Sequence, residues 1–502
     1  MTAAYSTPVA RHSRVRLVRR LCLLLVVLVG LGALSGACVH LWVERRAKLV
    51  PPGVTVLGEA PRRAGSLRWL DRSFVVKRGN LSEVHLRGTP VQIGYAHSRL
   101  LYPEMVRNEG ELYAELERQV PSALLRALIL DLAQWRYHRV DRGMAEDRRR
   151  ELAAQALGFQ PDPYTSWFDT YQRFIYLSAL YDIALSFEHS PLIGCTTFSL
   201  GRSVTGDGKV ILARAFDFEV SDIFDEEKAV FFVEEAGAIP FASVAWPGLV
   251  GVVSGMNRSG LGVVVHGGRA GTPAAEGEPV VHALRRVLSR CHTTAQAVEA
   301  LASSSPMVSH IVIVSDASGD SRVIERVPGR QQFVAALEDA AVVTNHFRGP
   351  AAEDPKNLQV RRATSTLHRE RRGETLLRGL PHGIEALGAV RLLRDRRASD
   401  GTALPLGDRR AIDALIATHG VVMDLSDRVL WVSEGPHLLG RFLGFRLPTH
   451  LASDHDNPVP WGDLPRIEAD ALLTSGGYSE WKARRVQARG GDDSVAGGPL
   501  AE

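Results

Sequence analysis

Cysteine and lysine are both scarce in this chain of 502 residues. It has four cysteines, and only six of its 60 basic residues are lysine. Four cysteines are too few for a disulfide framework, so the folded part must be stable through its own hydrophobic core. With 45% apolar and 23% charged residues, the composition excludes collagen-like, low-complexity and wholly disordered proteins.

Most of the chain carries no excess of positive charge. Residues 1–20 contain five arginines and no acidic residue, whereas the other 482 residues carry 55 basic and 56 acidic groups. A nucleic-acid-binding protein is expected to concentrate positive charge on its folded part. The net charge of +4 therefore indicates a membrane or targeting signal, and we predict no nucleic-acid partner.

One long hydrophobic run follows the basic tail. Residues 21–43 would form a helix roughly 35 Å long, enough to cross a hydrocarbon core of about 30 Å. The arginines before it favour a cytoplasmic N-terminus and an extracytoplasmic remainder. We predict an uncleaved, single-pass signal anchor. The alternatives are secretion after signal cleavage near residues 33–37 and lipid attachment at Cys38.

Pattern changes divide the chain into six parts. We predict a basic tail over 1–20, the anchor over 21–43, a linker over 44–65, two folded regions over 66–194 and 195–480, and a disordered tail over 481–502. Helical spacing prevails from about 103 to 187, and strand-like alternation from 195 to 345 with one helical stretch at about 278–304. This order predicts an α+β domain in which helices cover antiparallel sheets.

Cys195 is the candidate reactive residue. It begins a predicted strand, and the next strand, which contains Arg214 and Asp217, follows a hairpin signal over residues 205–208. A two-residue turn would place Cys195 opposite Val220, and a three- or five-residue turn would place it opposite Asp217. Either register brings Asp217 within about 10 Å of Cys195.

Each of these residues also has an ordinary explanation. A lone cysteine in an apolar strand is more often a core residue than a nucleophile. Arg214 and Asp217 are three apart, so a regular strand directs them to opposite faces, and both reach Cys195 only if the strand ends or bulges near Phe216. Asn345 lies at a predicted strand end, where asparagine is usually a turn residue.

Five short motifs nevertheless occur in an order that resembles a known family. They are Gly194-Cys-Thr-Thr197, Arg214-Ala-Phe-Asp217, Gly255-Met-Asn-Arg-Ser-Gly-Leu261, Asp316-Ala-Ser-Gly319 and Thr344-Asn-His-Phe347. Together they resemble the acyl-coenzyme A:6-aminopenicillanate acyltransferase family, N-terminal-nucleophile hydrolases related to choloylglycine hydrolases and acid ceramidases. The resemblance covers roughly residues 80–445 and implies a four-layer αββα sandwich.

The resemblance also implies a mechanism. The chain would cleave itself between Gly194 and Cys195, where glycine would permit a strained turn. The freed α-amine would then serve as base for the thiol of the same residue. Arg214 would favour the thiolate, Asp217 would hold the α-amine, and Asn345 would donate to the oxyanion.

Two further residues are possible oxyanion or substrate contacts. His266 lies where relatives often have asparagine, and it would be either a donor or an ordinary strand-end histidine. Asn257 more simply shapes the turn 257–260. The group Asp454-His-Asp456 is too compact for a metal site, and the chain has no HExxH, phosphate-cradling or dinucleotide motif. We therefore predict no metal and no cofactor.

These observations predict a membrane-anchored enzyme that acts on a linear acyl amide through an acyl-cysteine thioester, as hydrolase or acyltransferase. Residues 66–194 and 195–480 would become alpha and beta chains that stay associated. One alternative is a thiol hydrolase without self-cleavage, in which Cys195 works with His266 or His346. The other is a catalytically inactive, membrane-anchored binding protein of the same fold.

Overall fold

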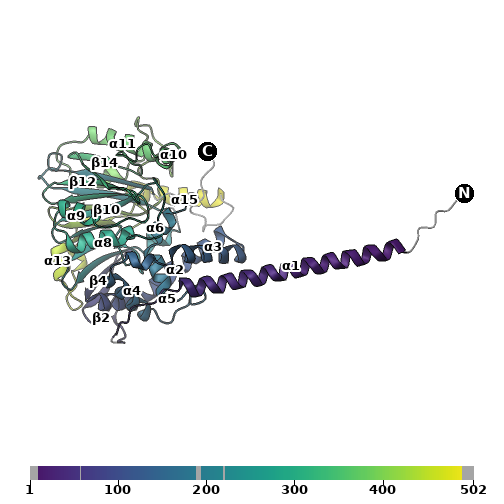
Figure 1. The fold of residues 1–502 in the computed structure, drawn as a ribbon. Coiled ribbons are helices and arrows are strands. Elements are labelled where there is room, and N and C mark those ends of the chain that lie inside the picture. The colour runs from purple at the N-terminus through teal and green to yellow at the C-terminus, as the bar shows by residue number, and fades with distance from the viewer. Residues whose placement is uncertain (1–8, 57, 188–193, 219–220, 489–502) are drawn as a thin grey trace. The chain divides into compact units, whose positions relative to one another are not determined.

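The computed structural model describes residues 9–56, 58–187, 194–218 and 221–488 (Figure 1). The chain divides into two compact units. The first is Met1–Leu49 with Val120–His138, and the second is Val50–Gln119 with Arg139–Glu502. Each unit is described by itself below.

The first unit contains two helices, α1 (Val9–Ala47) and α3 (Ala123–Tyr137). The segment Arg19–Ala47 of α1 is long and apolar enough to cross a membrane by length and composition, a test that a signal sequence also passes. Helix α3 is capped by Ser122, whose hydroxyl accepts a hydrogen bond from the backbone of Leu125.

The second unit contains two sheets. The larger has eleven described strands in the order β1-β2-β3-β4-β7-β8-β9-β10-β11-β12-β13. These are β1 (Arg62–Ala64), β2 (Leu67–Leu70), β3 (Ser73–Arg78), β4 (Leu81–Gly88), β7 (Ala229–Glu235), β8 (Phe241–Ala245), β9 (Ser254–Asn257), β10 (Leu261–Gly267), β11 (His310–Asp316), β12 (Ser321–Arg326) and β13 (Phe333–Ala336). Neighbouring strands are antiparallel except for β4 and β7, which pair in parallel.

The smaller sheet has seven described strands, all antiparallel to their neighbours, in the order β14-β5-β6-β15-β16-β17-β18. These are β14 (Ala340–Val343), β5 (Gly194–Leu200), β6 (Ile211–Asp217), β15 (Ala417–Asp424), β16 (Val429–Ser433), β17 (Phe442–Arg446) and β18 (Arg466–Ile467). Strand β5, which begins at the residue before Cys195, therefore lies near one edge of this sheet.

Helices connect and cover the strands. In the second unit they are α2 (Pro90–Gln119), η1 (Val140–Gly143), α4 (Glu146–Gly158), α5 (Thr170–Ser178), α6 (Leu180–Leu185), α7 (Ile223–Glu226), α8 (Val280–Arg290), α9 (Thr294–Ala302), α10 (Pro355–Ala363), α11 (Thr366–Arg378), α12 (Ala386–Leu393), α13 (Leu447–Ala452), η2 (Trp461–Asp463), α14 (Ala471–Thr474) and α15 (Gly477–Ala488).

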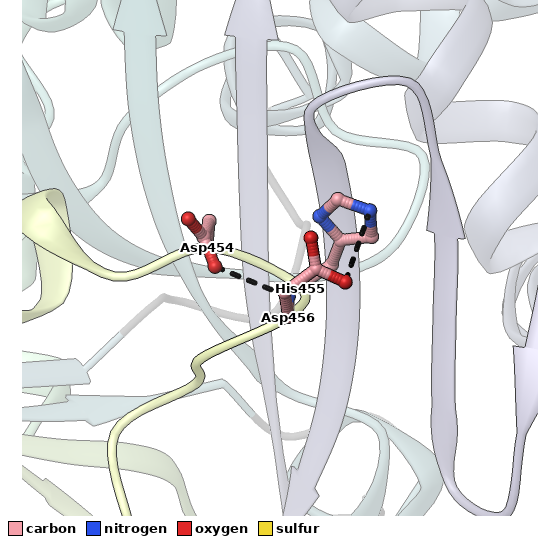
Figure 2. A group of neighbouring side chains, drawn as sticks. All are labelled: Asp454, His455 and Asp456. Atoms are coloured by element: carbon pink, nitrogen blue, oxygen red, sulfur yellow. Dashed lines mark hydrogen bonds and ion pairs between the residues drawn. The ribbon is translucent and has the colours of Figure 1, made fainter.

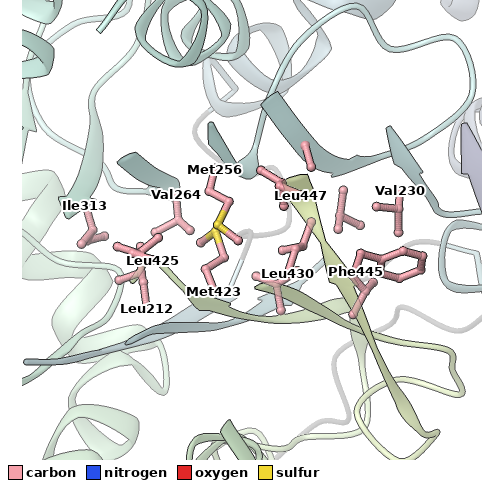
Figure 3. Close-up of a cluster of buried hydrophobic side chains, with 14 of the residues drawn as sticks. Leu212, Val230, Met256, Val264, Ile313, Met423, Leu425, Leu430, Phe445 and Leu447 are labelled. Atoms are coloured by element: carbon pink, nitrogen blue, oxygen red, sulfur yellow. The ribbon is translucent and has the colours of Figure 1, made fainter. Parts of the chain in front are cut away.

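The two sheets pack face to face over a shared hydrophobic core (Figure 3). Val264 and Met256 of the larger sheet meet Leu212 and Met423 of the smaller one in this core. Because side chains alternate along a strand, Ala213 of β6 points the other way, into a second core against α12. Helices α8 and α9 contact β9, β10 and β11. The predicted four-layer α+β sandwich is confirmed.

The region upstream of Cys195 is part of the larger sheet. Strands β1 to β4 extend that sheet through the parallel pairing of β4 with β7, from Ser82 opposite Ala229 to Gly88 opposite Glu235. The two regions separated by Gly194 therefore share one continuous hydrogen-bonded sheet.

The end of the chain is more regular than its composition suggests. Helix α15 covers residues 481–488, which the sequence pattern assigned to a disordered tail. Tyr478 and Trp481 pack against Leu415 and Leu439, and the Trp481 indole donates to the backbone of Leu406. Through these contacts α15 has a buried hydrophobic side, which the glycine-rich sequence around it did not indicate. Residues 489–502 lie outside the described residues.

Candidate active site around Cys195

The β5–β6 ladder brings Cys195 and Asp217 together in a register that neither predicted turn gives. Cys195 pairs with Phe216, and Gly194 pairs with Asp217. The ladder extends to Leu200 opposite Ile211, and beyond it Thr205 bridges to Ile384. Asp217 is therefore nearer to Cys195 than the two-residue turn predicts, and one row away from the directly opposite position that the longer turn predicts.

The thiol of Cys195 is fully buried and faces the space between the sheets. Arg214 Nη2 donates a hydrogen bond to Sγ at 3.2 Å, and Sγ lies 3.9 Å from the Val265 carbonyl oxygen of β10. Burial raises the pKa of the thiol, and the Arg214 charge offsets only part of that effect. The buried environment therefore favours the neutral thiol over the thiolate.

Arg214 and Asp217 point to opposite faces of β6, as regular alternation requires. Arg214 faces the larger sheet, donates to the Val253 carbonyl at 2.9 Å, and stacks over the Phe216 ring at 4.2 Å. Both residues still reach Cys195, because one contacts its side chain and the other lies beside its backbone. The irregularity predicted near Phe216 occurs in the neighbouring strand, between Ala417 and His419 of β15.

Asp217 borders the peptide bond between Gly194 and Cys195. A Cβ atom at position 194 would lie 3.0 Å from the Asp217 Cβ and 3.2 Å from its Oδ2. Gly194 is not in the left-handed region, so the structure does not show the strained turn expected from the sequence at this residue, and a larger side chain here would crowd Asp217. Burial raises the pKa of Asp217 to about 6, although Arg369 and Arg409 lower it in part.

Asn345 follows β14 and contacts the same backbone. Its Oδ1 accepts from the Cys195 amide at 2.7 Å, and its Nδ2 donates to the Gly267 carbonyl at 3.0 Å. Asn345 therefore accepts at Cys195 in this structure, whereas the resemblance implied a donor to the oxyanion. The role of Asn345 as an oxyanion donor stays a prediction.

Sequence reasoning missed Arg369 of α11. Its guanidinium donates to the Cys195 carbonyl, to Thr196 Oγ1 at 2.8 Å and to Asn345 Oδ1 at 2.9 Å. Burial lowers its pKa. The sequence around it, Leu367-His-Arg-Glu-Arg-Arg372, is typical of a solvent-exposed helix. Arg369 lies with Thr366 on the buried face of α11, and this burial cannot be recognised from the sequence alone.

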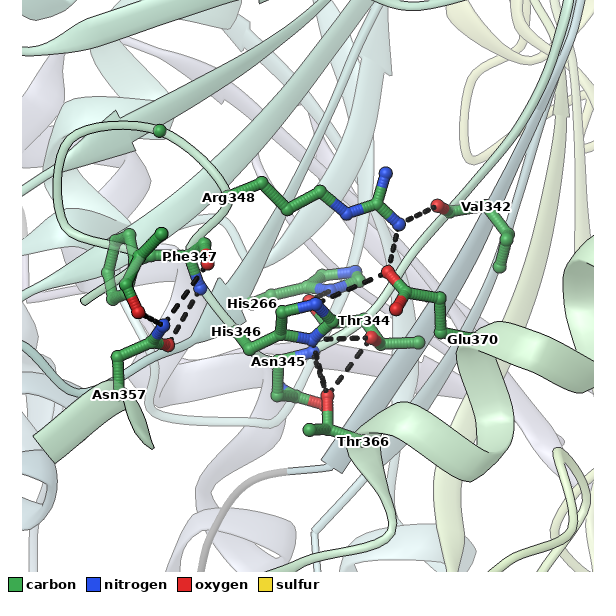
Figure 4. Close-up of polar contacts among 12 residues, drawn as sticks. His266, Val342, Thr344, Asn345, His346, Phe347, Arg348, Asn357, Thr366 and Glu370 are labelled. Atoms are coloured by element: carbon green, nitrogen blue, oxygen red, sulfur yellow. Dashed lines mark hydrogen bonds and ion pairs between the residues drawn. The ribbon is translucent and has the colours of Figure 1, made fainter. Parts of the chain in front are cut away.

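His266 is a buried residue of β10 that bridges two neighbouring segments (Figure 4). Its Nδ1 lies 3.0 Å from the Thr344 carbonyl, so this nitrogen donates, and Nε2 then accepts from the Thr197 hydroxyl at 2.6 Å. Burial, and next the Arg214 charge, hold its pKa well below the usual value. Both ring nitrogens have partners, which favours the ordinary structural role left open above.

His346 also belongs to a network beside the thiol and not to the thiol itself (Figure 4). Its Nδ1 lies 3.2 Å from Thr366 Oγ1, and its Nε2 lies 3.3 Å from Glu370 Oε1. Within the described residues, the contacts of the Cys195 sulfur are with Arg214 and Val265, so no histidine touches it.

Asn257 lies outside the site, contrary to its inclusion as a possible oxyanion or substrate contact. Its Nδ2 donates to the carbonyls of Leu288 and Cys291, and its Oδ1 accepts from the amides of Ser259 and Leu261. All four contacts lie in the β9–β10 turn and at the end of α8. The side chain is fully used in shaping the hairpin and securing that helix.

An apolar pocket adjoins the candidate site. Its lining includes Phe216, which pairs with Cys195, together with Tyr181 and Ala184 of α6, Phe218 and Trp246. The Tyr181 hydroxyl is buried, has no hydrogen-bond partner among the described residues, and feels the charges of both Cys195 and Arg214. The lining is mainly apolar, and its polar side chains are Asn108, Glu109, Ser178 and Tyr181.

A second group of potential ligands lies elsewhere in the second unit (Figure 2). Ligand atoms of Asp454, His455 and Asp456 all lie within 4.8 Å of one another. Both acids are exposed, and Asp454 Oδ1 accepts from the backbone amides of Asp456 and Asn457. The arrangement is that of an exposed turn stabilised by an aspartate side chain.

Comparison with known proteins confirms the resemblance. The family model described as acyl-coenzyme A:6-aminopenicillanic acid acyl-transferase matches residues 204–431. An uncharacterized protein of Archaeoglobus fulgidus is 24% identical over 265 residues, which are 49% of this chain, and the chain spans about 43% of that relative.

Three solved structures are also similar. An N-acylethanolamine-hydrolyzing acid amidase ortholog of Caenorhabditis elegans is 16% identical, with a TM-score of 0.34 over 46% of this chain and 93% of its own. A mutant conjugated bile acid hydrolase of Clostridium perfringens is 12% identical, with 0.36 over 55% and 97%. Penicillin V acylase of Agrobacterium tumefaciens is 18% identical, with 0.32 over 48% and 82%.

Proposed function

We propose that this chain, whose residues 204–431 match the 6-aminopenicillanic acid acyl-transferase model, is a self-cleaving enzyme with an N-terminal cysteine nucleophile. The observation that carries the proposal is the position of Cys195 between two charged residues. Arg214 contacts its sulfur, and Asp217 borders the peptide bond before it. A structural cysteine does not require a charged group on each side of the sheet.

Self-cleavage uses these groups in order. The Cys195 sulfur attacks the carbonyl carbon of Gly194, the carbon–nitrogen bond breaks, and the thiol proton ends on the new α-amine. Water then hydrolyses the thioester, which leaves a carboxylate on Gly194 and frees the thiol. Asp217 is a carboxylate above its pKa of about 6 and borders the peptide bond that would break, where it would accept and return the proton.

Catalysis on a substrate repeats the chemistry on a second amide. The α-amine of Cys195 takes the thiol proton, and the sulfur attacks the substrate carbonyl to form an acyl-cysteine thioester. The proton passes to the departing amine, and water or another amine accepts the acyl group. Arg369 and Asn345, which already contact the backbone of Cys195, supply positive charge and an amide to the oxyanion region.

The pocket supports a proposal for the substrate class. Aromatic and aliphatic side chains surround the space next to Phe216, which suits a linear acyl chain in the pocket with its amide at Cys195. Tyr181, which interacts electrostatically with Cys195, is the polar group of the lining that would meet the amide end. An anchor formed by α1 would hold the enzyme at a membrane, where amphiphilic acyl amides concentrate.

The two chains would remain associated after cleavage. Strand β4 and strand β7 lie on opposite sides of the cleavage point in sequence and are paired over seven positions. The alternative of a cysteine–histidine hydrolase is less well supported, because His266 and His346 are engaged with other partners.

Cys195→Ala tests the proposal. The wild-type chain should yield two fragments on a denaturing gel, and sequencing of the second should begin Cys195-Thr-Thr. The variant should stay intact and inactive toward a panel of acyl amides, whereas the control Cys291→Ala should be cut normally. An intact wild-type chain that hydrolyses amides would refute the N-terminal nucleophile, and an intact chain unlabelled by thiol-reactive acyl probes would indicate a binding protein.

A further inference from the structure

Helix α3 of the first unit has a large apolar face that is left in solvent. The face consists of Leu124, Leu125, Leu128, Leu132 and Trp135, each at least 50% exposed. At about 100° per residue, these five side chains lie in one stripe about 100° wide. Soluble proteins rarely leave so continuous an apolar stripe uncovered.

The stripe lies beside the candidate membrane span within the same compact unit. His40 Nδ1 of α1 and Asp131 Oδ1 of α3 are 2.8 Å apart. His40 is three residues before the end of the apolar run at Val43, about 4.5 Å along the helix axis. Asp131 therefore lies at the level where the apolar run of α1 ends, and Leu132 of the stripe follows it directly in sequence.

The side chains at this level suit a membrane interface. Trp42 of α1 and Trp135 of α3 are both exposed, and tryptophan prefers the headgroup region of a bilayer. Basic residues Arg45 and Arg46 follow at the end of α1, and Arg136 is exposed at the end of α3. Basic side chains of this kind pair with lipid phosphates.

We propose that α3 is a second membrane-contacting helix, which lies in the plane of the bilayer surface with its leucine stripe in the acyl boundary. The proposal rests on the membrane anchor of the proposed function. A lipid bilayer is favoured over a second copy of the chain because the stripe continues the apolar surface of α1 and is bordered by tryptophan and arginine.

Spin labelling of the full chain in phosphatidylcholine–phosphatidylglycerol nanodiscs tests this. Cys22 and Cys38 are first replaced by serine and Cys195 and Cys291 by alanine, and single labels are then placed by Leu128→Cys in the stripe, Leu31→Cys in α1 and Leu387→Cys as the control. Leu387 is an exposed leucine of α12, outside the first unit. Relaxation by oxygen relative to a nickel chelate should be several-fold higher at 128 than at 387. Leu125→Cys repeats the measurement should the first variant misfold.

The label at 31 separates the two claims. A lipid signal at 31 with a water signal at 128 would overturn the second contact and leave the anchor intact. Water signals at both positions would overturn both, and a lipid signal at 128 alone would support α3 while refuting the anchor. Dipolar broadening between labels at 128 would assign the stripe to a second copy of the chain and overturn the proposal.

Discussion

Arg214 donates to the sulfur of Cys195 over 3.2 Å while the same guanidinium is held by backbone of the opposite sheet. It donates to the carbonyls of Val253 and Val265, which lie beside and within the larger sheet. Arg214 itself belongs to β6 of the smaller sheet. The charge beside the thiol is therefore positioned by the face-to-face packing of the two sheets.

Arg214→Gln should impair the thiol specifically. Burial already raises the pKa of Cys195, and loss of the adjacent charge should raise it further. A rise of about one unit lowers the thiolate fraction about tenfold and should lower kcat/KM at neutral pH by about the same factor. The rate of alkylation by iodoacetamide as a function of pH measures the pKa directly. Arg214→Lys, which keeps the charge, should shift the profile less, and identical profiles for all three would refute the role.

Self-cleavage should depend on pH through Asp217. Its pKa of about 6 means that the group is a carboxylate above pH 6 and a neutral acid below it. If the carboxylate accepts the proton, the cleavage rate of freshly translated chain should fall about tenfold per pH unit below that value. Asp217→Asn should remove this limb and slow cleavage about a hundredfold or more.

The same pKa predicts an effect on stability with a defined sign. The folded chain binds the Asp217 proton more tightly than the unfolded chain does, because the pKa of this carboxyl rises from 3.8 to about 6 on folding. The contribution of Asp217 to the free energy of unfolding therefore falls as pH rises from about 4 to 6. In a Cys195→Ala background, Asp217→Asn should therefore raise the melting temperature at pH 8 and have little effect at pH 4. Equal effects at both values would contradict a raised pKa.

Several parts of this site can be predicted from local sequence, and others cannot. Cys195, Arg214 and Asp217 lie on adjacent strands, so a hairpin signal suffices to bring them together. The register differs from both predicted registers, and the residues between the two strands contact a segment far away in sequence, where Thr205 bridges to Ile384. Arg369 reaches the site from a helix whose sequence is typical of an exposed surface.

Asn257 is the opposite case, a residue that the sequence predicts as a possible site contact although its hydrogen bonds lie elsewhere. It belongs to a motif that resembles the family, but its four hydrogen bonds are local to one turn and one helix end. A motif residue can therefore serve the scaffold and not the chemistry. The fold class was predictable, because the alternation of apolar residues reports which faces of strands and helices are buried.

Tyr181→Phe should separate function from stability. The Tyr181 hydroxyl is buried without a partner among the described residues, so its removal should leave the melting temperature unchanged or raise it. If the hydroxyl contacts the substrate amide, kcat/KM should fall about tenfold while self-cleavage proceeds normally. Steady-state kinetics and a thermal melt check both points. Unchanged kinetics would show that the hydroxyl does not contact the substrate.

Ala184→Phe should shorten the pocket. Ala184 lines the space next to Phe216 and Tyr181, and a phenyl ring there would occupy part of the volume proposed for the acyl chain. Activity on long-chain acyl amides should fall by more than tenfold, whereas short-chain amides should be little affected. A kcat/KM series over chain length measures this. Ala302→Phe, on the exposed end of α9, is the control. A uniform loss across all lengths would indicate misfolding and refute the acyl pocket.

Glu151→Gln should weaken the association between the regions before and after Cys195. Glu151 of α4 accepts from Arg148 of the same helix and from Arg285 of α8 at 2.7 Å, and both arginines also pair with Glu235 of β7. The four side chains are buried or nearly so, and their charges balance. Loss of one acid leaves a buried positive charge uncompensated, which typically costs about 3–5 kcal/mol.

The alpha and beta chains of the Glu151→Gln variant should therefore separate at lower urea concentration than those of the wild type, as followed by size-exclusion chromatography. Glu146→Gln is a matched control on the same helix, because Glu146 and Arg150 form an exposed pair at 3.9 Å. An exposed pair of this kind contributes about 0.5 kcal/mol or less, so the control should behave as wild type. Equal effects of the two variants would mean that the buried network does not hold the chains together and that the β4–β7 pairing suffices.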